Sequence, residues 1–326
     1  MRVSRFSSNL SLQIPNGQSR LNMKTSPPST VQAPLDRLSA LLERFRVRAH
    51  LFHTGPLCGV THFAAKPGRG FLHVLRRGEM AISHRLDSGQ MHRLVITEPT
   101  LLFYPRPLAH DFKNAPKEGS DLTCATLDFD GGDSHPLVRA LPGVVIFPLK
   151  QVEGLTQSLE LLFAETDQLR CGHRLLADRL FEVVLLQLLR WMLDHPVDHH
   201  FPDRRVSVGL LAGLSDPALV RVLVALHEEP GHSWSLESMA QRAGMSRSAF
   251  AVKFKALVGE TPADYLAYWR LTIAQTQLRQ GRSVKAIANE LGYANASALS
   301  RVFAQKIGIS PRAWLEAAQA SDHAVK

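Results

Sequence analysis

The spacing of apolar residues divides the chain into regions of different predicted structure. The segment PLDRLSALLERFR, 34–46, places five apolar side chains on one face of a short helix, namely Leu35, Leu38, Leu41, Leu42 and Phe45. From about 47 to 150 the apolar segments are short, rich in β-branched and aromatic residues, and separated by Gly and Pro. This pattern predicts closely spaced strands of a sandwich or barrel. Residues 152–195 show a helical period, and beyond about residue 215 the pattern predicts short capped helices, so the expected fold class is α+β.

These changes of pattern predict four regions in the 326 residues. The expected boundaries are 1–33 for a disordered tail, 34–150 for a β domain, 151–205 for a helical connector that ends in a polar linker, and 206–318 for a helical domain. The first region carries scattered Arg, Ser and Pro without a continuous apolar run, so it is either a tail or the product of an upstream start codon. Residues 175–193 are apolar around more than half of the predicted helix, which indicates a buried helix or an oligomer seam.

The helical domain contains a predicted helix-turn-helix at 234–259. Ser235 and Ser246 are placed to cap two successive helices, and Gly244 provides the tight turn between them. The expected inward positions of the two helices are Leu236, Met239, Ala240, Phe250, Phe254 and Leu257.

The same pattern returns about 49 residues later. Here Ser283 and Asn295 are the expected caps and Gly292 the turn, and the expected inward positions are Val284, Ile287, Ala288, Leu299, Phe303 and Ile307. The segment 261–281 between the two copies predicts one connecting helix, with Leu266, Trp269, Ile273 and Leu278 on its apolar face. Two recognition helices on a rigid helix can enter successive major grooves on one face of DNA, about 34 Å apart.

Many short amphipathic helices share one such pattern, but two copies joined in this way resemble the AraC/XylS family of transcription regulators. The resemblance covers about residues 216–315 and rests on SDPALVRVLVALHEEPGHSWSLESMAQRAGMSRSAF, YLAYWRLTIAQTQLR and VKAIANELGYANASALSRVFAQKIGISPRAW. It implies sequence-specific binding to double-stranded promoter DNA, with recruitment or blocking of RNA polymerase. The 38 Lys and Arg against 29 Asp and Glu give a net charge of +9, which suits a polyanionic partner but also fits a basic protein without one.

Exposed positions early in each recognition helix are the candidate DNA contacts. They are Arg247, Ser248, Ala251, Val252, Lys253 and Lys255 in the first copy, and Asn295, Ala296, Ser297, Ser300 and Arg301 in the second. Several first-copy positions are small where the family often has long polar or aromatic residues. We therefore expect sparse base readout there, through Ser hydrogen bonds and contacts with thymine methyl groups. Lys253 and Lys255 can reach phosphate, and Arg301 is the leading candidate for a guanine or phosphate contact; simple solvent exposure is the alternative for each residue.

The β domain is similar to the cupin-type sensory barrel common in that family, through FHTGPLCG, GFLHVLRRG, LLFYPRPLAHDF and LTCATLDF. A branch that includes reactive-chlorine sensors has a Cys, His, His, Cys set in matching places, which here are Cys58, His73, His110 and Cys124. Two thiolates and two imidazoles form a complete tetrahedral set for Zn²⁺ or another soft transition metal. Their spacings match no zinc finger, so only the fold can group them.

Two other interpretations of the same residues stay open. If Cys58 and Cys124 lie on neighbouring strands, an oxidant could join them as a disulfide. Alternatively, both cysteines and both histidines are ordinary buried residues. Cys171 lies in a helical segment and is expected to be a small core residue. The segment TEPTLLFYP, with Glu98, replaces the usual cupin Gly-Asp turn, which argues against a dioxygenase-type metal site.

The remaining function classes fit the sequence less well. It contains no G-x-S-x-G, no phosphate-binding Gly loop and no H-E-x-x-H, so we do not expect an enzyme. A pure interaction module would leave two recognition helices without a purpose. Three cysteines suit a reducing cytoplasm, and no run approaches the roughly 18 apolar residues of a membrane helix. The sequence thus predicts a cytoplasmic regulator whose β domain senses a metal, an oxidant or a small molecule, with a second copy of the chain as a further candidate partner.

Overall fold

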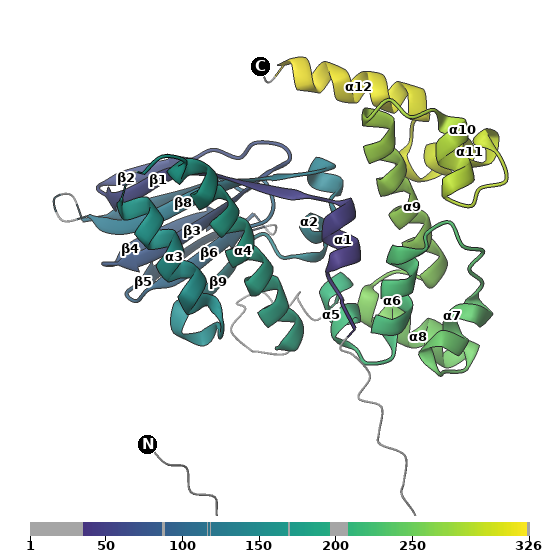
Figure 1. Cartoon of the computed structure of the whole chain (residues 1–326), viewed down its shortest axis with the longest axis horizontal. Helices are drawn as coiled ribbons and strands as arrows, with labels where there is room; N and C mark the ends of the chain where they lie inside the picture. Colours follow the sequence, from purple (N-terminus) through teal and green to yellow (C-terminus); the bar gives the residue numbers. More distant parts are fainter. Residues whose placement is uncertain are drawn as a thin grey trace, which may run out of the picture. The chain divides into compact units, whose positions relative to one another are not determined.

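The computed structural model describes residues 35–86, 89–115, 117, 119–168, 170–195 and 208–324 (Figure 1). The predicted tail at 1–33 and most of the predicted linker that ends at residue 205 lie outside these described residues. The chain divides into two units, Met1–Leu35 and Asp36–Lys326, and the second contains the helices and strands that the structure describes.

The first half of this unit is mainly β structure, and the second half is entirely helical where it is described. The strands are β1 (Val47–Leu57), β2 (Val60–Phe63), β3 (Arg69–Arg77), β4 (Met80–Arg85), β5 (Met91–Ile96), β6 (Thr100–Tyr104), β7 (His110–Asn114), β8 (Ser120–Phe129) and β9 (Val145–Pro148). The helices that accompany them are α1 (Ser39–Arg44), η1 (Gly132–Ser134), α2 (Pro136–Ala140), η2 (Leu149–Gln151), α3 (Leu155–Asp167) and α4 (His173–Asp194). The helices of the second half are α5 (Leu210–Ser215), α6 (Leu219–Glu228), α7 (Leu236–Ala243), α8 (Arg247–Val258), α9 (Pro262–Arg279), α10 (Val284–Glu290), α11 (Ala296–Ile307) and α12 (Pro311–Ala324).

The strands form two antiparallel sheets. One sheet has the order β1-β8-β3-β6-β9 and the other β2-β7-β4-β5, and the described strands of the two sheets stay separate. The predicted β domain is thus confirmed as an open double-sheet form of the cupin barrel. In the sheets, β3 pairs with β8 so that His73 lies opposite Cys124, and β4 pairs with β7 so that His84 lies opposite His110.

Alternation along the central strands divides their side chains between two cores. The odd-numbered residues Phe71 and Leu75 of β3 join a core between the sheets, whereas Leu72 and Val74 face a second core. Because both faces of β3 are covered, the strand is an almost continuous run of buried residues, as expected for a strand packed on both sides.

Helices α3 and α4 pack against the five-stranded sheet (Figure 1). Asp178 of α4 accepts a hydrogen bond from the backbone N–H of Leu51 at 2.6 Å, which occupies a donor on the edge strand β1. The predicted apolar helix 175–193 is only partly covered. Its inner face is buried, but Leu175, Leu176, Val183 and Leu186 remain exposed. Among the described helices, none combines the length and the apolar character that a membrane span requires.

Candidate nucleic-acid interface and buried histidine cluster

The first predicted helix-turn-helix is present as α7 and α8. The Ser235 hydroxyl accepts from the N–H of Ser238 at 3.1 Å, and the Ser246 hydroxyl accepts from the N–H of Ala249 at 3.4 Å. Gly244 ends α7 with φ of 69°, a left-handed conformation that favours glycine. These features confirm the predicted caps and turn.

One inward position of this motif was predicted wrongly. Leu236 is 43% exposed, whereas Met239, Phe250 and Phe254 are buried as expected. Leu236 is the first residue of α7, and its neighbour in the chain is the capping Ser235. The end of a short helix lies at the rim of the core, so a helical period assigns its first residue poorly.

The second helix-turn-helix is present as α10 and α11, with the expected caps. The Ser283 hydroxyl accepts from the N–H of Ala286 at 3.3 Å, and the Asn295 side-chain oxygen accepts from the N–H of Ala298 at 2.8 Å. Gly292 has φ of 71°, close to the value of its counterpart in the first copy. The predicted connecting helix is α9, and all four of its predicted apolar positions, Leu266, Trp269, Ile273 and Leu278, are buried.

Some of the candidate contact residues of α8 already form ion pairs within the protein. Val252 is 72% exposed, and Ser248 and Lys255 are exposed, whereas Ala251 is half-buried. Arg247 is exposed, but its Nε lies 3.1 Å from Glu237 Oε2. Lys253 is half-buried, with Nζ 2.7 Å from Asp216 Oδ2, so this lysine is already held within the protein.

On α11 the candidate contacts are less engaged with the protein. Ser297 and Arg301 are exposed, and no ion pair within the described part of the chain involves Arg301. Ala296 and Ser300 are half-buried. Asn295 is exposed, but its side-chain oxygen is used in the helix cap. A free guanidinium in the second turn of α11 is the strongest single candidate for a contact with base or phosphate.

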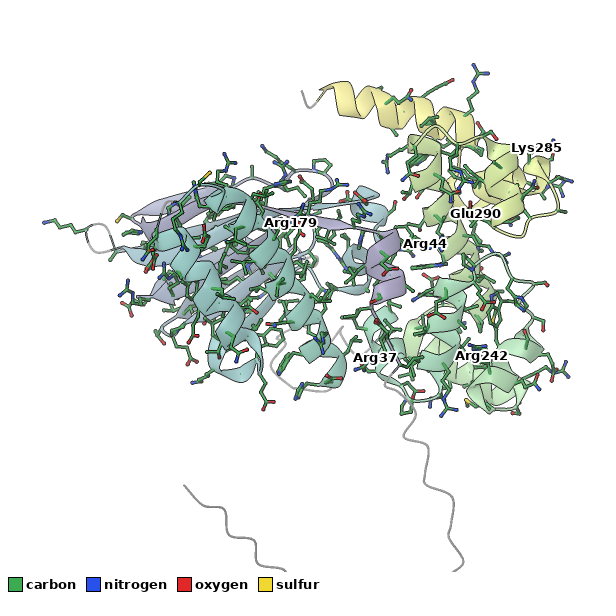
Figure 2. All side chains as sticks on the ribbon, viewed as in Figure 1. Arg37, Arg44, Arg179, Arg242, Lys285 and Glu290 are labelled. Atoms are coloured by element: carbon green, nitrogen blue, oxygen red, sulfur yellow. The ribbon has the colours of Figure 1, made fainter. Side chains whose placement is uncertain are left out.

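Lys285, which sequence reasoning missed, belongs to the same half of the domain (Figure 2). It is exposed in the first turn of α10, the helix that precedes the recognition helix. The first helix of such a motif crosses the DNA backbone, so a lysine there can reach phosphate. Its position two residues after the cap Ser283 already places it in the first turn of that helix in the sequence.

Polar ties attach the second motif to α9. Gln277 Nε2 donates to Glu290 Oε1 at 2.7 Å, and Arg282 pairs with the other oxygen of Glu290. Lys306 near the end of α11 donates to Asp264 Oδ1 at 2.6 Å. These ties join both ends of the connecting helix to the second motif.

The buried chemistry of the cupin domain is centred on two histidines. His73 Nε2 lies 3.0 Å from His110 Nε2, and His110 Nδ1 lies 2.8 Å from the carbonyl oxygen of Leu108. Burial lowers the pKa of His110 to about 4 and that of His73 well below its usual value, so both rings are neutral at pH 7. A carbonyl can only accept, so His110 carries its proton on Nδ1, and His73 Nε2 must donate to it.

This arrangement leaves unpaired polar atoms in the core. His73 Nδ1 is then an acceptor without a hydrogen-bond partner in the described part of the chain. The Tyr104 hydroxyl also has no hydrogen-bond partner there. The Tyr104 ring stacks on His110 with centroids 3.9 Å apart. Cys124 is fully buried opposite His73, and burial raises the pKa of its thiol, which keeps it protonated.

The four predicted metal ligands are not gathered in this structure. Within the residues described, no group of three or more His, Cys, Asp or Glu side chains is placed to hold a metal ion. Cys58 is exposed in the turn after β1, with Sγ 4.0 Å from the carbonyl oxygen of Lys117. Cys124 lies opposite His53, and His53 is five residues before Cys58. Because a strand rises about 3.3 Å per residue, the two cysteines are about 16 Å apart. A disulfide needs Cα atoms within about 7 Å, so this state cannot form one.

Cys171 also differs from its prediction. It is exposed, between α3 and α4, rather than part of a core. The chain turns there at Gly172, which has φ of 81°, so the helical period breaks where a continuous helix was expected.

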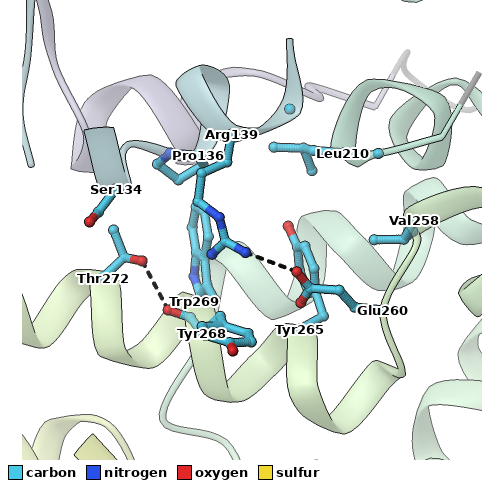
Figure 3. A pocket seen from close by; sticks show the side chains of 12 residues that line it. Ser134, Pro136, Arg139, Leu210, Val258, Glu260, Tyr265, Tyr268, Trp269 and Thr272 are labelled. Atoms are coloured by element: carbon cyan, nitrogen blue, oxygen red, sulfur yellow. Dashed lines mark hydrogen bonds and ion pairs between the residues drawn. The ribbon is translucent and has the colours of Figure 1, made fainter. Parts of the chain in front are cut away.

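A pocket of about 100 Å³ lies where residues near α2 meet α9 (Figure 3). Arg139 Nη2 donates to Glu260 Oε1 at 2.9 Å across it, and the guanidinium carbon lies 4.8 Å from the ring centroid of Tyr268. Nearby, the ring of Phe45 meets Trp269 of α9 edge-on, with centroids 5.0 Å apart. Side chains of the first half of the chain therefore contact the helix that joins the two motifs.

Comparison with known proteins agrees with both halves. A cupin family matches residues 36–194, and a helix-turn-helix domain family matches residues 239–317. A protein of Streptomyces antibioticus whose name describes an AraC-like transcription regulator is 37% identical over 178 residues, which are 54% of this chain and 56% of that protein. The "RCS-specific HTH-type transcriptional activator RclR" of Escherichia coli K12 is 26% identical over 248 residues, which are 75% of this chain and 83% of that protein.

A solved structure matches part of the chain as well. The DNA-binding domain of AdpA, described as a global transcriptional factor in complex with a target DNA, is 32% identical, with a TM-score of 0.30. The match covers 33% of this chain and 96% of that one. The chain spans little more than half the length of the relative from Streptomyces. These relatives are named as transcription factors or regulators and not as enzymes.

Proposed function

Because this chain belongs to the AraC-like family, with a cupin domain followed by a helix-turn-helix domain, we propose that it binds double-stranded promoter DNA and regulates transcription. The observation that carries the proposal is the pair of recognition helices, α8 and α11, on one connecting helix. Each presents exposed residues at the positions expected to face DNA, with Ser248 and Val252 on α8 and Ser297 and Arg301 on α11.

The test is selection of DNA by the full chain from a library of random duplexes, followed by footprinting of the selected sequence. We expect two protected major-groove patches on one face of the duplex, about one helical turn apart. Affinity should fall steeply with salt, because contacts to phosphate release counterions. Failure to enrich any sequence, or protection without two patches, would contradict sequence-specific binding by both motifs.

We propose further that the cupin domain is the sensory part and that the signal acts at the cluster of His73, His110, Tyr104 and Cys124. Neutral imidazoles with an unpaired acceptor beside an unpaired hydroxyl are polar groups that a ligand could satisfy. The trigger is a soft metal such as Zn²⁺, an oxidant or a small organic molecule. Because Cys58 lies far from the other three, the structure supports no four-ligand metal site in this state, and we assign no step to a metal.

Two measurements on the purified chain separate these triggers. The first is metal content for the wild type and Cys58→Ser. The second is DNA affinity with hydrogen peroxide, where Cys124→Ser should abolish a response that acts at the cluster, and Cys58→Ser should abolish one that depends on the exposed thiol. Cys171→Ser is the matched control, because Cys171 is a second exposed cysteine outside the cupin core. No bound metal and no response to peroxide or Zn²⁺ would leave an organic effector.

The other partners are also proposals. The exposed apolar face of α4, with Val183 and Leu186, suits a homodimer in which this face is covered by a second copy. Val183→Glu should then shift the sedimentation coefficient to that of a monomer, whereas Val60→Glu, at an exposed residue of strand β2, should not. We also propose that the chain acts in the cytoplasm and that RNA polymerase is the partner that its activity would require.

A further inference from the structure

The turn of the second helix-turn-helix motif directly touches the backbone segment that precedes the first motif. Gly231 lies between α6 and α7, just before the first motif, and Gly292 is the turn of the second motif. A Cβ atom on Gly231 would lie 2.2 Å from the carbonyl oxygen of Glu290, and one on Gly292 would lie 2.2 Å from the carbonyl oxygen of Gly231. Such distances are far below any van der Waals contact, so only glycine permits this approach.

Arg270 of α9 forms hydrogen bonds with the residues on both sides of Gly231. Its Nε donates to the carbonyl oxygen of Pro230 at 2.7 Å, and its Nη2 donates to that of His232 at 2.9 Å. These are the carbonyls on either side of Gly231. The guanidinium carbon also lies 5.5 Å from the ring centroid of Tyr293, the residue after Gly292. One planar side chain thus contacts both the segment before the first motif and the turn of the second motif.

We infer that the Gly231–Gly292 contact, fastened by Arg270, sets the spacing between the two recognition helices and so determines which half-site spacing the protein selects. The inference rests on the proposed function. Helix α9 fixes the distance between its own ends, and polar ties hold α10 and α11 to it. A small rotation of α10 and α11 about the end of α9 would still alter the angle between α8 and α11. The glycine contact opposes that rotation because it joins the turn of the second motif to the segment before α7. Each added base pair moves a half-site by about 3.4 Å and rotates it by roughly 35°, so a small change of angle alters the preferred spacing.

The experiment uses the full chain and the duplex that it selects from a random library. Affinity is measured by fluorescence anisotropy for that duplex and for versions with two base pairs inserted or removed between the half-sites. For the wild type we expect the altered spacing to weaken binding about 100-fold, because the second motif can no longer bind together with the first. In Gly231→Ala the preference should fall to less than about threefold or move to another spacing.

Three further variants separate positioning from general damage. Arg270→Lys keeps the positive charge but loses the fork that spans two carbonyls, so it should reduce spacing selectivity like Gly231→Ala without introducing a clash. Gly292→Ala combines the clash with backbone strain. Gly244→Ala is its matched control, because Gly244 occupies the same turn of the first motif with φ of 69° and has no neighbouring atom within 4 Å of an added Cβ. Gly244→Ala should lose stability but retain the wild-type selectivity.

Each of the following results either supports or contradicts the inferred role of the Gly231–Gly292 contact. Loss or shift of spacing preference in Arg270→Lys and in Gly231→Ala, but not in Gly244→Ala, supports the inference, and Arg270→Lys alone suffices if Gly231→Ala fails to fold. Wild-type selectivity in folded Arg270→Lys and Gly231→Ala overturns it. If the wild type itself enriches no DNA, the proposed function has failed; if it enriches paired half-sites and the variants match it, only this inference has failed.

Discussion

The two helix-turn-helix motifs have nearly the same local design but different support. The first, α7 and α8, packs on α5 and α6, with Phe250 and Phe254 fully buried in a core shared with Tyr265 of α9. The second, α10 and α11, packs chiefly on α9 and α12, with Phe303 buried near Trp314. The first motif therefore packs on more helices, whereas the second is attached through apolar contacts with α9 and α12, polar ties and a glycine contact.

Two motifs of equal local design can therefore differ in stability and in independence. A motif with apolar neighbours on several helices should unfold together with them, because removing any helix exposes the shared core. A motif that packs on fewer helices should open more independently, because its attachments beyond those helices are polar ties that each contribute little. The second motif is therefore the part whose position the rest of the protein can most easily alter.

Removing one core ring from each motif should change stability most. Phe254→Ala and Phe303→Ala should each cost about 3–5 kcal/mol in the free energy of unfolding, through lost burial and a residual cavity. We expect Phe254→Ala to expose the amides of α5 to α9 to hydrogen exchange together, but Phe303→Ala to expose chiefly α10 to α12. Hydrogen exchange followed by mass spectrometry gives the measurement. Equal exposure of α8 and α11 in Phe303→Ala would show that the two motifs unfold as one.

The next largest effect concerns charged side chains that contact DNA, whose contribution to affinity should differ between the two motifs. Arg301→Ala should weaken binding to the selected duplex by about 1–3 kcal/mol, because Arg301 is free to reach a base or phosphate. Arg247→Ala should cost less, since Arg247 already pairs with Glu237. Arg312→Ala, which removes an exposed arginine that pairs with Glu316, is the control. Anisotropy at several salt concentrations gives both affinity and salt slope, and a larger loss for Arg247→Ala than for Arg301→Ala would contradict the comparison.

Local sequence signals predicted these motifs well because their causes are local. The caps Ser235, Ser246, Ser283 and Asn295 each bond to an N–H three residues ahead, so a few neighbouring residues contain the whole signal. The cupin strands were also predictable as a class from their composition and turns.

Long-range pairing was not predictable in this way. Cys124 lies in β8 and Cys58 directly follows its partner strand β1, but the register offsets the two cysteines by five residues, and no local pattern reveals a register. The contact of Gly231 with Gly292 joins residues 61 positions apart, and Gly231 has an ordinary backbone φ that gives no separate reason for a glycine. Only the fold shows why that side chain must be absent.

A fall in pH should destabilise the surroundings of the first motif but not the second motif. His227 of α6 is buried against Trp269, with Nε2 2.6 Å from the Tyr265 hydroxyl, and burial lowers its pKa from 6.5 to about 3. Residues 262–311 contain no histidine. Since the folded pKa is below the unfolded one, the unfolded state binds more protons between pH 6.5 and about 3. The stabilisation is complete above pH 6.5 and is lost as the pH falls, by at most about 1.4 kcal/mol per pH unit.

The measurement is the urea midpoint of the wild type and of His227→Gln between pH 4 and pH 7. Buried histidines of the cupin domain titrate in both proteins, so the difference between the two curves isolates His227. We expect the wild type to lose stability faster than the variant below pH 6.5. Parallel curves would mean that His227 is not kept neutral by its position.

The smallest effect in this series comes from the helix caps. Ser246→Ala and Asn295→Ala should each cost about 1 kcal/mol, because each leaves an N–H at the start of a recognition helix without its acceptor. The Asn295 bond is the shorter, at 2.8 Å against 3.4 Å, and the helix that it caps has fewer apolar supports. We therefore expect Asn295→Ala to increase hydrogen exchange at the start of α11 more than Ser246→Ala does at the start of α8. The comparison is made without DNA, because Asn295 is also a candidate contact, and Asn295→Asp serves as a variant that retains the acceptor. If Ser246→Ala had the larger effect, then the packing of α8 on its neighbours would not compensate for a lost cap, and the second motif would be no more dependent on polar ties than the first.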